Sequence, residues 1–217
     1  MPKYTCLATM RIPRALLLGF FLSTPAGAQI MVEPSSTVGT RALQIETSLT
    51  HSRKETLRSW STPTLVRLGI GEALELRAES DLWVREASGA NTHTGVADLS
   101  VGLKWTATVG QPGLSLLLHT NLPTGSHQWQ REGVHPSLRG ILEWNLAAGA
   151  HLGIMPGVER SGMVDGVETT GFLGLALGKG WGKRFRTFLE LELYHIAGSG
   201  TGGNTGNWNA GGTYLLG

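Results

Sequence analysis

The sequence predicts an all-β protein: an antiparallel up-and-down transmembrane β-barrel with about ten strands in 217 residues. Three observations favour this fold class. Apolar and polar residues alternate with a period of two in one segment after another, which is typical of strands with two different faces. Short turns alternate with long polar connections along the chain. The chain also begins with the features of a secretory signal peptide.

The composition is consistent with a single β-rich domain. The chain contains 31 Gly, 41% hydrophobic residues and only 16% charged residues. Such a sequence is rich in glycine and poor in the Lys and Glu that usually cover the helices of soluble proteins. No segment shows the spacing of an amphipathic helix.

Residues 1–28 are predicted to form a signal peptide. Lys3, Arg11 and Arg14 form its basic region, and residues 15–22 (ALLLGFFL) form its apolar core. Residues 26–28 (AGA) match the small-residue cleavage site that ends such peptides. The apolar core is too short for a spanning helix, which needs roughly 20 apolar residues. We therefore expect export to the bacterial outer membrane, with residues 29–40 as a periplasmic lead-in and residues 41–217 as the barrel.

Removal of this leader changes the charge balance. The whole chain has 18 Lys and Arg against 16 Asp and Glu, and the leader holds three of the cations and none of the acids. The remaining chain is close to neutral, so its charge gives no reason to expect a nucleic-acid partner. Cys6, the only cysteine, also lies in the leader. An internal disulfide or a cysteine-ligated metal site is therefore not expected after cleavage.

The clearest alternation lies in residues 73–85 (ALELRAESDLWVR). One face carries Leu74, Leu76, Ala78, Leu82 and Val84, and the other carries Glu75, Arg77, Glu79, Asp81 and Arg85. In a soluble antiparallel sheet the charged face would meet water. In a membrane barrel the apolar face would meet lipid and the charged face would line the lumen.

Similar alternation predicts nine further strands. The ten expected strands are residues 43–50, 64–70, 73–85, 98–109, 114–122, 137–146, 150–158, 172–178, 187–195 and 208–216. The segment 172–178 is almost entirely apolar, so the sequence leaves its facing open.

The connections distinguish between the two kinds of sheet. Short turns are expected at residues 71–72, 110–113, 147–149 and 179–184, and long connections at residues 52–61, 86–95, 124–135, 159–170 and 198–207. Outer-membrane barrels have tight turns on the periplasmic side and long loops on the outside. A soluble sandwich has no reason to keep this order, so the membrane barrel is favoured.

Four segments carry a resemblance to a known family. They are STPTLVRLGIGEALELR (61–77), DLSVGLKW (98–105), NLPTGS (121–126) and GGTYLL (211–216), in this order. The chain resembles the bacterial outer-membrane family named for a meta-pathway of phenol degradation. The resemblance implies a β-barrel akin to hydrocarbon and fatty-acid channels. The family name reflects genetic context, so phenol is not taken as the solute. A further hairpin is expected after the last segment. The chain is therefore either a truncated form of a barrel with about 12 strands, which we favour, or a barrel that closes with ten strands.

The alternation also predicts which charged residues line the lumen. They are Glu46, Arg67, Glu75, Arg77, Glu79, Asp81, Arg85, Asp98, Lys104, Arg139, Glu143, Glu190 and Glu192. These residues could form a polar conduit or a salt-bridge network that fills the lumen. A filled or gated lumen is slightly favoured over an open one. Because an unpaired buried charge is costly, Arg67 and Arg77 are each expected to pair with a neighbouring acid.

Catalytic and metal sites are not predicted. Ser115 and His119 share a face, but four residues along a strand separate them by roughly 13 Å. The histidines at 51, 93, 127 and 135 lie in the expected loops without a metal-ligand spacing. We therefore expect no enzyme activity, no cofactor and no metal.

The predicted function is the passive passage of a small hydrophobic or aromatic solute through an outer-membrane channel. Its expected partners are outer-membrane lipid, the solute and the barrel assembly machinery. A soluble periplasmic or secreted β-sheet protein that binds a ligand is the first alternative. An outer-membrane lipid hydrolase is the second.

Overall fold

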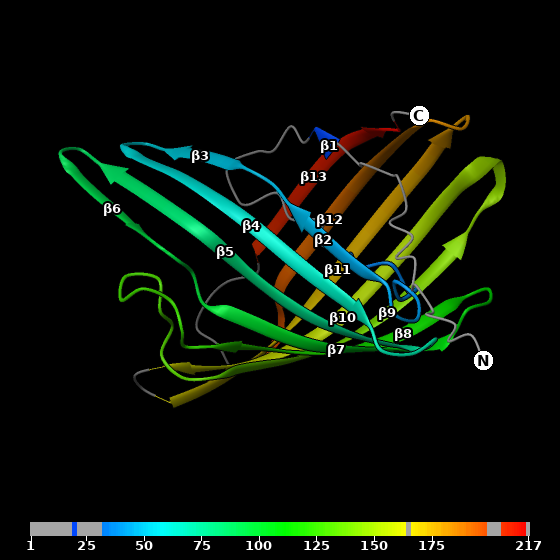
Figure 1. The fold of residues 1–217 in the computed structure, drawn as a ribbon, viewed down its shortest axis with the longest axis horizontal. Coiled ribbons are helices and arrows are strands. Elements are labelled where there is room, and N and C mark those ends of the chain that lie inside the picture. The colour runs from blue at the N-terminus through cyan, green and yellow to red at the C-terminus, as the bar shows by residue number, and fades with distance from the viewer. Residues whose placement is uncertain (1–18, 21–31, 164–165, 199–204, 216–217) are drawn as a thin grey trace, which may run out of the picture.

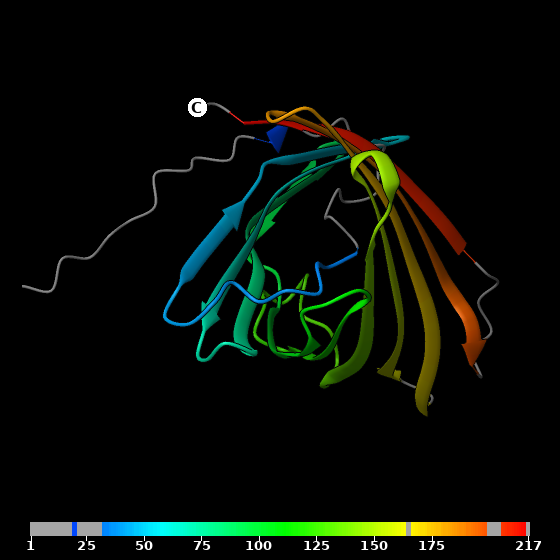
Figure 2. The ribbon, with the colours of Figure 1, turned by 90° about the vertical axis from the view of Figure 1, so that its right-hand side faces the viewer.

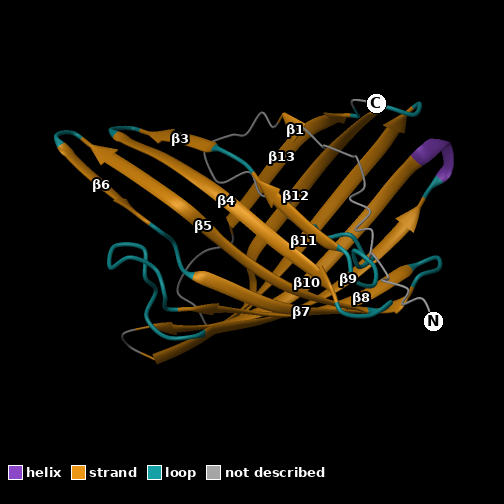
Figure 3. Ribbon diagram, viewed as in Figure 1, coloured by secondary structure: helices purple, strands orange, loops and turns teal. Residues whose placement is uncertain are grey.

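The computed structural model describes residues 19–20, 32–163, 166–198 and 205–215. These residues form thirteen strands and one 3₁₀ turn, η1 (Ala147–Gly149), and they contain no α-helix (Figure 3). The predicted all-β class is confirmed.

Every strand pairs antiparallel with its neighbours, and the chain runs up and down between them. The strands are β1 (Gly19–Phe20), β2 (Leu43–Thr47), β3 (Thr50–Lys54), β4 (Leu57–Gly69), β5 (Leu74–Ser88), β6 (Asn91–Gly95), β7 (Leu99–Thr108), β8 (Gly113–Leu122), β9 (His135–Asn145), β10 (Ala150–Met163), β11 (Gly166–Trp181), β12 (Phe185–Gly198) and β13 (Thr205–Tyr214).

Two passes of the sheet are each formed by two strands with a break between them. β2 and β3 both pair with β4, so they form one pass of the sheet with a break at residues 48–49. β6 and β7 both pair with β5 and are separated by residues 96–98. When each pair is taken as one pass and the two-residue β1 is left aside, the described residues make ten passes. This number agrees with the ten strands that the sequence predicts.

The sheet has two edges. Its pairing path runs from β1 and β13 at one edge to β2 at the other, and no pairing joins these edges among the described residues. β1 pairs only with Gly212 and Thr213. Because β1 lies in the predicted signal peptide, cleavage would leave β13 as the edge strand.

The two ends of the sheet differ in their connections. The β4–β5, β7–β8, β9–β10 and β11–β12 turns lie at one end, and the β3–β4 and β5–β6 hairpin tips lie at the other (Figure 1). Several connections predicted as long loops are instead strand continuations. β4 and β5 pair as far as Leu57 and Ser88, and Gly89, with a φ of +59°, begins the turn into β6. These extensions are held by backbone pairing, and their sequences show no regular alternation of apolar and polar residues from which strands could be predicted.

The sheet curls around an interior (Figure 2). Many of its charged side chains are buried on the inner face, and many of its leucines are exposed on the outer face. On β5, Glu75 and Arg77 are 0% and 6% exposed, whereas Leu76 between them is 44% exposed. Many other leucines share this outward exposure, among them Leu43, Leu68, Leu103, Leu116, Leu118, Leu138 and Leu189. Two faces of opposite character therefore follow from the period of two.

A β-bulge changes this alternation at one point. The register between β4 and β5 shifts at Ser61 and Pro63, so that Ser61 lies opposite Val84 while Pro63 lies opposite Asp81. After the shift Val84 is buried and Arg85 is exposed. The expectation that Arg85 lines the interior is therefore wrong, because the extra residue of a bulge reverses the facing of the residues beyond it.

Candidate functional site

Residues 32–38, which precede the first long strand, lie inside the curled sheet. We call them the inner segment. In Figure 2 this stretch is the blue tube that crosses the interior. The sequence predicts only a lead-in here, yet its main chain and side chains contact inward-facing residues of β4, β5, β7, β9 and β12. The interior is therefore occupied by the chain's own N-terminal region.

The inner segment contacts the sheet through an ion-pair cluster around Glu33. One carboxylate oxygen lies 2.6 Å from Arg77 Nη2, and the other lies 3.3 Å from Arg67 Nη2. Arg67 also lies 3.2 Å from Glu46, and Arg77 Nε lies 3.8 Å from Glu75. The prediction that both arginines pair with neighbouring acids is confirmed, but Glu33 was not expected among them.

The charge state of Glu33 follows from its surroundings. Burial disfavours the ionised carboxyl, but the nearby charges of Arg77 and Arg67 outweigh this effect and hold the pKa of Glu33 below its ordinary value. Glu33 is therefore a carboxylate at neutral pH. Its negative charge is the counterion that the two buried guanidinium groups require.

Lys104 binds the main chain of the inner segment. Its side chain is 0% exposed, and its ammonium group donates hydrogen bonds to the carbonyl oxygens of Pro34 and of Ser36, the latter at 2.7 Å. Thr106, two residues along β7, donates to the carbonyl of Ser35 at 2.8 Å. A buried ammonium group needs such acceptors because it has lost its water.

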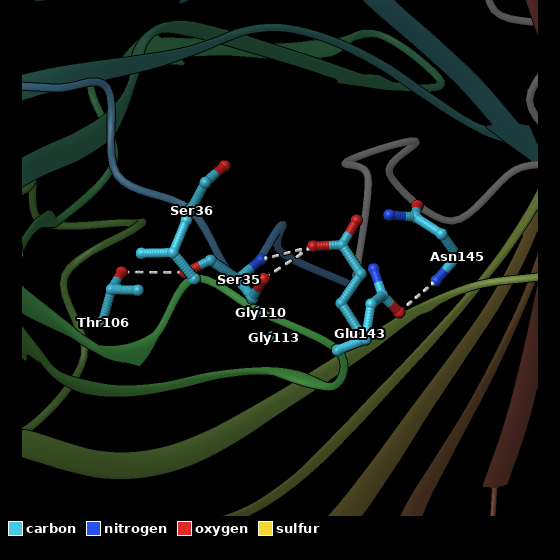
Figure 4. Close-up of a pocket in the computed structure, with 9 residues that line it drawn as sticks. Ser35, Ser36, Thr106, Gly110, Gly113, Glu143 and Asn145 are labelled. Atoms are coloured by element: carbon cyan, nitrogen blue, oxygen red, sulfur yellow. Dashed lines mark hydrogen bonds between the residues drawn. The ribbon is translucent and has the colours of Figure 1, made fainter.

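Three acids accept hydrogen bonds from the inner segment. Glu143 accepts from the Ser35 amide at 3.0 Å and from its hydroxyl at 2.7 Å (Figure 4). Glu75 accepts from the Val38 amide at 2.9 Å, and Glu190 accepts from the Val32 amide at 3.4 Å. A small pocket lies beside Ser35, between Glu143 and the β7–β8 turn at residues 109–113. Predicted lumen residues thus bind a peptide segment of this same chain.

One side of the interior is apolar, which the sequence did not predict. Val32 packs with a cluster that we call the apolar wall; its members are Leu117, Ile141, Met155 and Phe172, from β8, β9, β10 and β11. Inward-facing glycines make room for the Val32 side chain. A Cβ on Gly153 would lie only 2.9 Å from a methyl group of Val32, and a Cβ on Gly174 only 3.0 Å from the other. The inward position of Phe172 also settles the facing of β11 that the sequence left open.

Further polar groups lie on the inner face of the sheet. The guanidinium carbon of Arg139 lies 5.4 Å from the centre of the Phe172 ring, within the range of a cation–π contact. His119 Nε2 lies 3.9 Å from Glu79. Glu192, whose side chain hydrogen-bonds with Tyr194 and Asn207, is also buried. Asp81 is partly buried on β5, next along the same face from Glu79. The interior therefore combines ionic, aromatic and aliphatic surfaces.

Asp98 has a different position from the other predicted lumen residues. Its two carboxylate oxygens accept hydrogen bonds from the amides of Gly125 and Arg131, both at 2.8 Å. These amides belong to residues 123–134, which connect β8 to β9. Asp98 thus fixes a connecting loop.

Packing of the apolar wall gives a first testable prediction. A Cβ on Gly157 would lie 2.1 Å from Phe172 Cζ, so Gly157→Ala must displace this ring. We expect a loss of about 1–3 kcal/mol in the free energy of unfolding, as for other overpacked sites. Denaturant unfolding of the refolded protein in detergent, followed by tryptophan fluorescence, measures it. Gly140→Ala is the matched control, because its Cβ would make an ordinary 3.7 Å contact with Pro156; equal losses in both variants would contradict the prediction.

Ser115 and His119 do not form a hydrogen-bonded pair in the described residues. Ser115 Oγ is buried without a hydrogen-bond partner, while the ring of His119 approaches Glu79. No group of His, Cys, Asp and Glu in the described ranges could hold a metal ion. Within the same ranges there is no helix long and apolar enough to span a membrane.

Comparison with known families identifies the class of the chain. A family model described as "Putative MetA-pathway of phenol degradation" matches residues 32–217, which include the inner segment and all strands from β2 to β13. The chain belongs to this family, as its resemblance in four segments implies. No curated protein matches it significantly.

Proposed function

We propose that this chain is an outer-membrane β-barrel channel for passive passage of a small hydrophobic or aromatic solute, with its lumen obstructed by the inner segment at rest. After export and signal cleavage, the barrel assembly machinery inserts it into outer-membrane lipid. Transport needs no cofactor and no covalent chemistry. The solute moves along an interior that offers both charged groups and the apolar wall.

The observation that carries this proposal is the inverted distribution of polar and apolar residues. Charged side chains such as Glu75 and Lys104 are fully buried, whereas outward leucines such as Leu76 are nearly half exposed. In water such an outer surface would be unfavourable over its whole extent. In a bilayer the same surface is matched to the lipid tails, and the polar interior is the usual arrangement of a membrane barrel.

The inner segment supports a gated lumen in preference to an open one. Its contacts reach both sides of the interior, from Arg67 and Arg77 on β4 and β5 to Glu143 on β9 and Glu190 on β12. A segment with one covalent attachment, at the start of β2, can leave this position without disrupting the strand pairing. The channel therefore has a structural basis for a closed and an open state.

The soluble alternative requires the opposite arrangement of the sheet. A soluble β-protein would bury its leucine face in a core and expose its charged face. The described residues instead expose many of these leucines, so this alternative has no comparable support. Neither does the lipid hydrolase, because Ser115 and His119 form no hydrogen bond with each other in the described residues.

Gel mobility provides the direct test of the barrel. Mature protein, residues 29–217, is refolded in mild detergent and run with and without boiling. A closed, detergent-stable barrel is expected to migrate differently before boiling, and vesicles that contain it to take up a small aromatic solute. A folded protein that stays in solution without detergent and shows no shift would refute the membrane channel.

A further inference from the structure

The cluster around Glu33 has the composition of a carboxylate-binding site. Arg67 and Arg77 lie directly opposite each other in the register of β4 and β5. Like charges at such positions repel each other, and both side chains are almost fully buried, at 11% and 3% exposure. The two guanidinium groups therefore need anions. Glu46 lies beside Arg67 and Glu75 beside Arg77, and the carboxylate of Glu33 is the anion that lies between the two arginines.

The arginine pair also has unused capacity for binding an anion. Arg67 Nε and Arg77 Nη1 are buried and have no hydrogen-bond partner. Glu33 uses only one nitrogen of each guanidinium group, at 3.3 and 2.6 Å. A guanidinium group can bind a carboxylate through two parallel hydrogen bonds. A free carboxylate, which is not constrained by a peptide chain, could engage the pair through more donors than Glu33 does.

The residue before Glu33 occupies a different kind of surface. Val32 lies on the apolar wall, in contact with the cluster that contains Met155 and Phe172. The inner segment thus presents an apolar side chain and a carboxylate on adjacent residues, one to the apolar wall and one to the arginine pair. A small molecule with an apolar body and one carboxylate carries the same two features.

We propose that Arg67 and Arg77 form a binding site for the carboxylate of a small apolar monocarboxylate, and that this ligand competes with Val32 and Glu33 for the interior. The proposal narrows the class of solute from hydrophobic or aromatic molecules to apolar molecules with one carboxylate. It rests on the proposed channel function only for the route by which the ligand enters the interior. Binding at this site displaces the inner segment, since both cannot neutralise the same arginine pair. Ligand binding and opening of the lumen are therefore coupled.

The test uses 4-fluorobenzoate and its neutral analogue 4-fluorobenzamide as probes, with ¹⁹F NMR titration of refolded protein in detergent. A variant that lacks residues 29–38 is expected to bind 4-fluorobenzoate at least tenfold more tightly than 4-fluorobenzamide. Full-length mature protein is expected to bind 4-fluorobenzoate at least tenfold more weakly than this variant. Equal affinities for the two probes, or no binding by a variant whose gel mobility shows that it is folded, would overturn the proposal.

Point variants distinguish binding at the arginine pair from a general effect of losing a positive charge. In the deletion background, Arg67→Gln is expected to remove the preference for 4-fluorobenzoate, whereas Arg131→Gln, at an exposed arginine near Glu159, is expected to retain it. If Arg67→Gln does not fold, the alternative variant is Glu33→Gln in the full-length mature protein. This variant is expected to bind 4-fluorobenzoate more tightly than the unsubstituted protein does. No increase in that variant would count against the competition.

Solute uptake by vesicles distinguishes this proposal from the proposed function. Selective binding of 4-fluorobenzoate without uptake of any solute would uphold the site and refute the channel. Uptake of neutral solutes together with equal binding of the two probes would uphold the channel and refute the site.

Discussion

Removal of residues 29–38 is expected to raise the rate of solute uptake into vesicles at least tenfold over that of the full-length mature protein. The inner segment is bound by charged or polar groups on five strands, and several of these groups are fully buried around it. Because strand pairing does not involve this segment, its loss leaves the sheet in place and frees the interior. Uptake of a small neutral aromatic solute, normalised to the inserted protein, measures the effect.

A single substitution tests the same idea with less disturbance. Glu33→Gln keeps the size of the side chain but removes the charge that lies between Arg67 and Arg77. We expect a rate of solute uptake between the rate of the full-length mature protein and the rate of the deletion variant. Glu55→Gln, at the exposed β3–β4 hairpin tip, is the matched control and is expected to have no effect. Unchanged uptake after deletion of the segment would show that it does not obstruct the lumen.

The sequence was sufficient to predict the strands of the sheet, but not the segment and the apolar wall that occupy its interior. Alternation along β5 predicts that Glu75 and Arg77 face one side and Leu76 the other, and their exposures agree. Such a pattern is a local property, because facing alternates residue by residue along any strand. It fails at the bulge beside Leu82 and Trp83, where one additional residue reverses the facing of Arg85. Nothing in the sequence marks the bulge.

The inner segment could not be predicted for a different reason. Its sequence, VEPSSTV, has no periodicity, and Glu33 contacts partners that are 34 and 44 residues away in the chain. Only the curled shape of the sheet brings these residues together. The need of Arg67 and Arg77 for anions was predictable, but the acid that supplies one was not. The apolar wall was missed because each of its strands contributes only one or two such residues.

The interior combines the two kinds of surface that an amphipathic solute requires. The arginine pair lies on β4 and β5, and the apolar wall lies on β8 to β11. The inner segment contacts both with adjacent residues, Val32 and Glu33. A segment that contacts both surfaces is held in the interior more specifically than a tail without such contacts would be. Under the proposed function, the same complementarity would make the closed state responsive to a ligand with similar chemistry.

Leu76→Arg is expected to prevent stable insertion of the barrel into a bilayer. Leu76 lies two residues from the start of β5, on the outward face beside Leu68 and Leu103, and is 44% exposed. An arginine that faces lipid costs about 2–4 kcal/mol at the midplane of a membrane barrel and less toward the interfaces, and a cost of this size is a substantial part of the stability of an ordinary domain. The fraction of refolded protein that inserts into vesicles and keeps its heat-dependent gel shift measures the loss.

The same substitution at a different depth supplies the control. Leu57, at the start of β4, lies beyond the region where alternation is regular and is 38% exposed. Because the cost of arginine falls to about 0–1 kcal/mol near the membrane interface, Leu57→Arg is expected to insert almost normally. Equal insertion of both variants would mean that Leu76 does not face lipid. The outward face of the sheet would then not be a lipid-facing surface, and the proposed membrane channel would lose its main support.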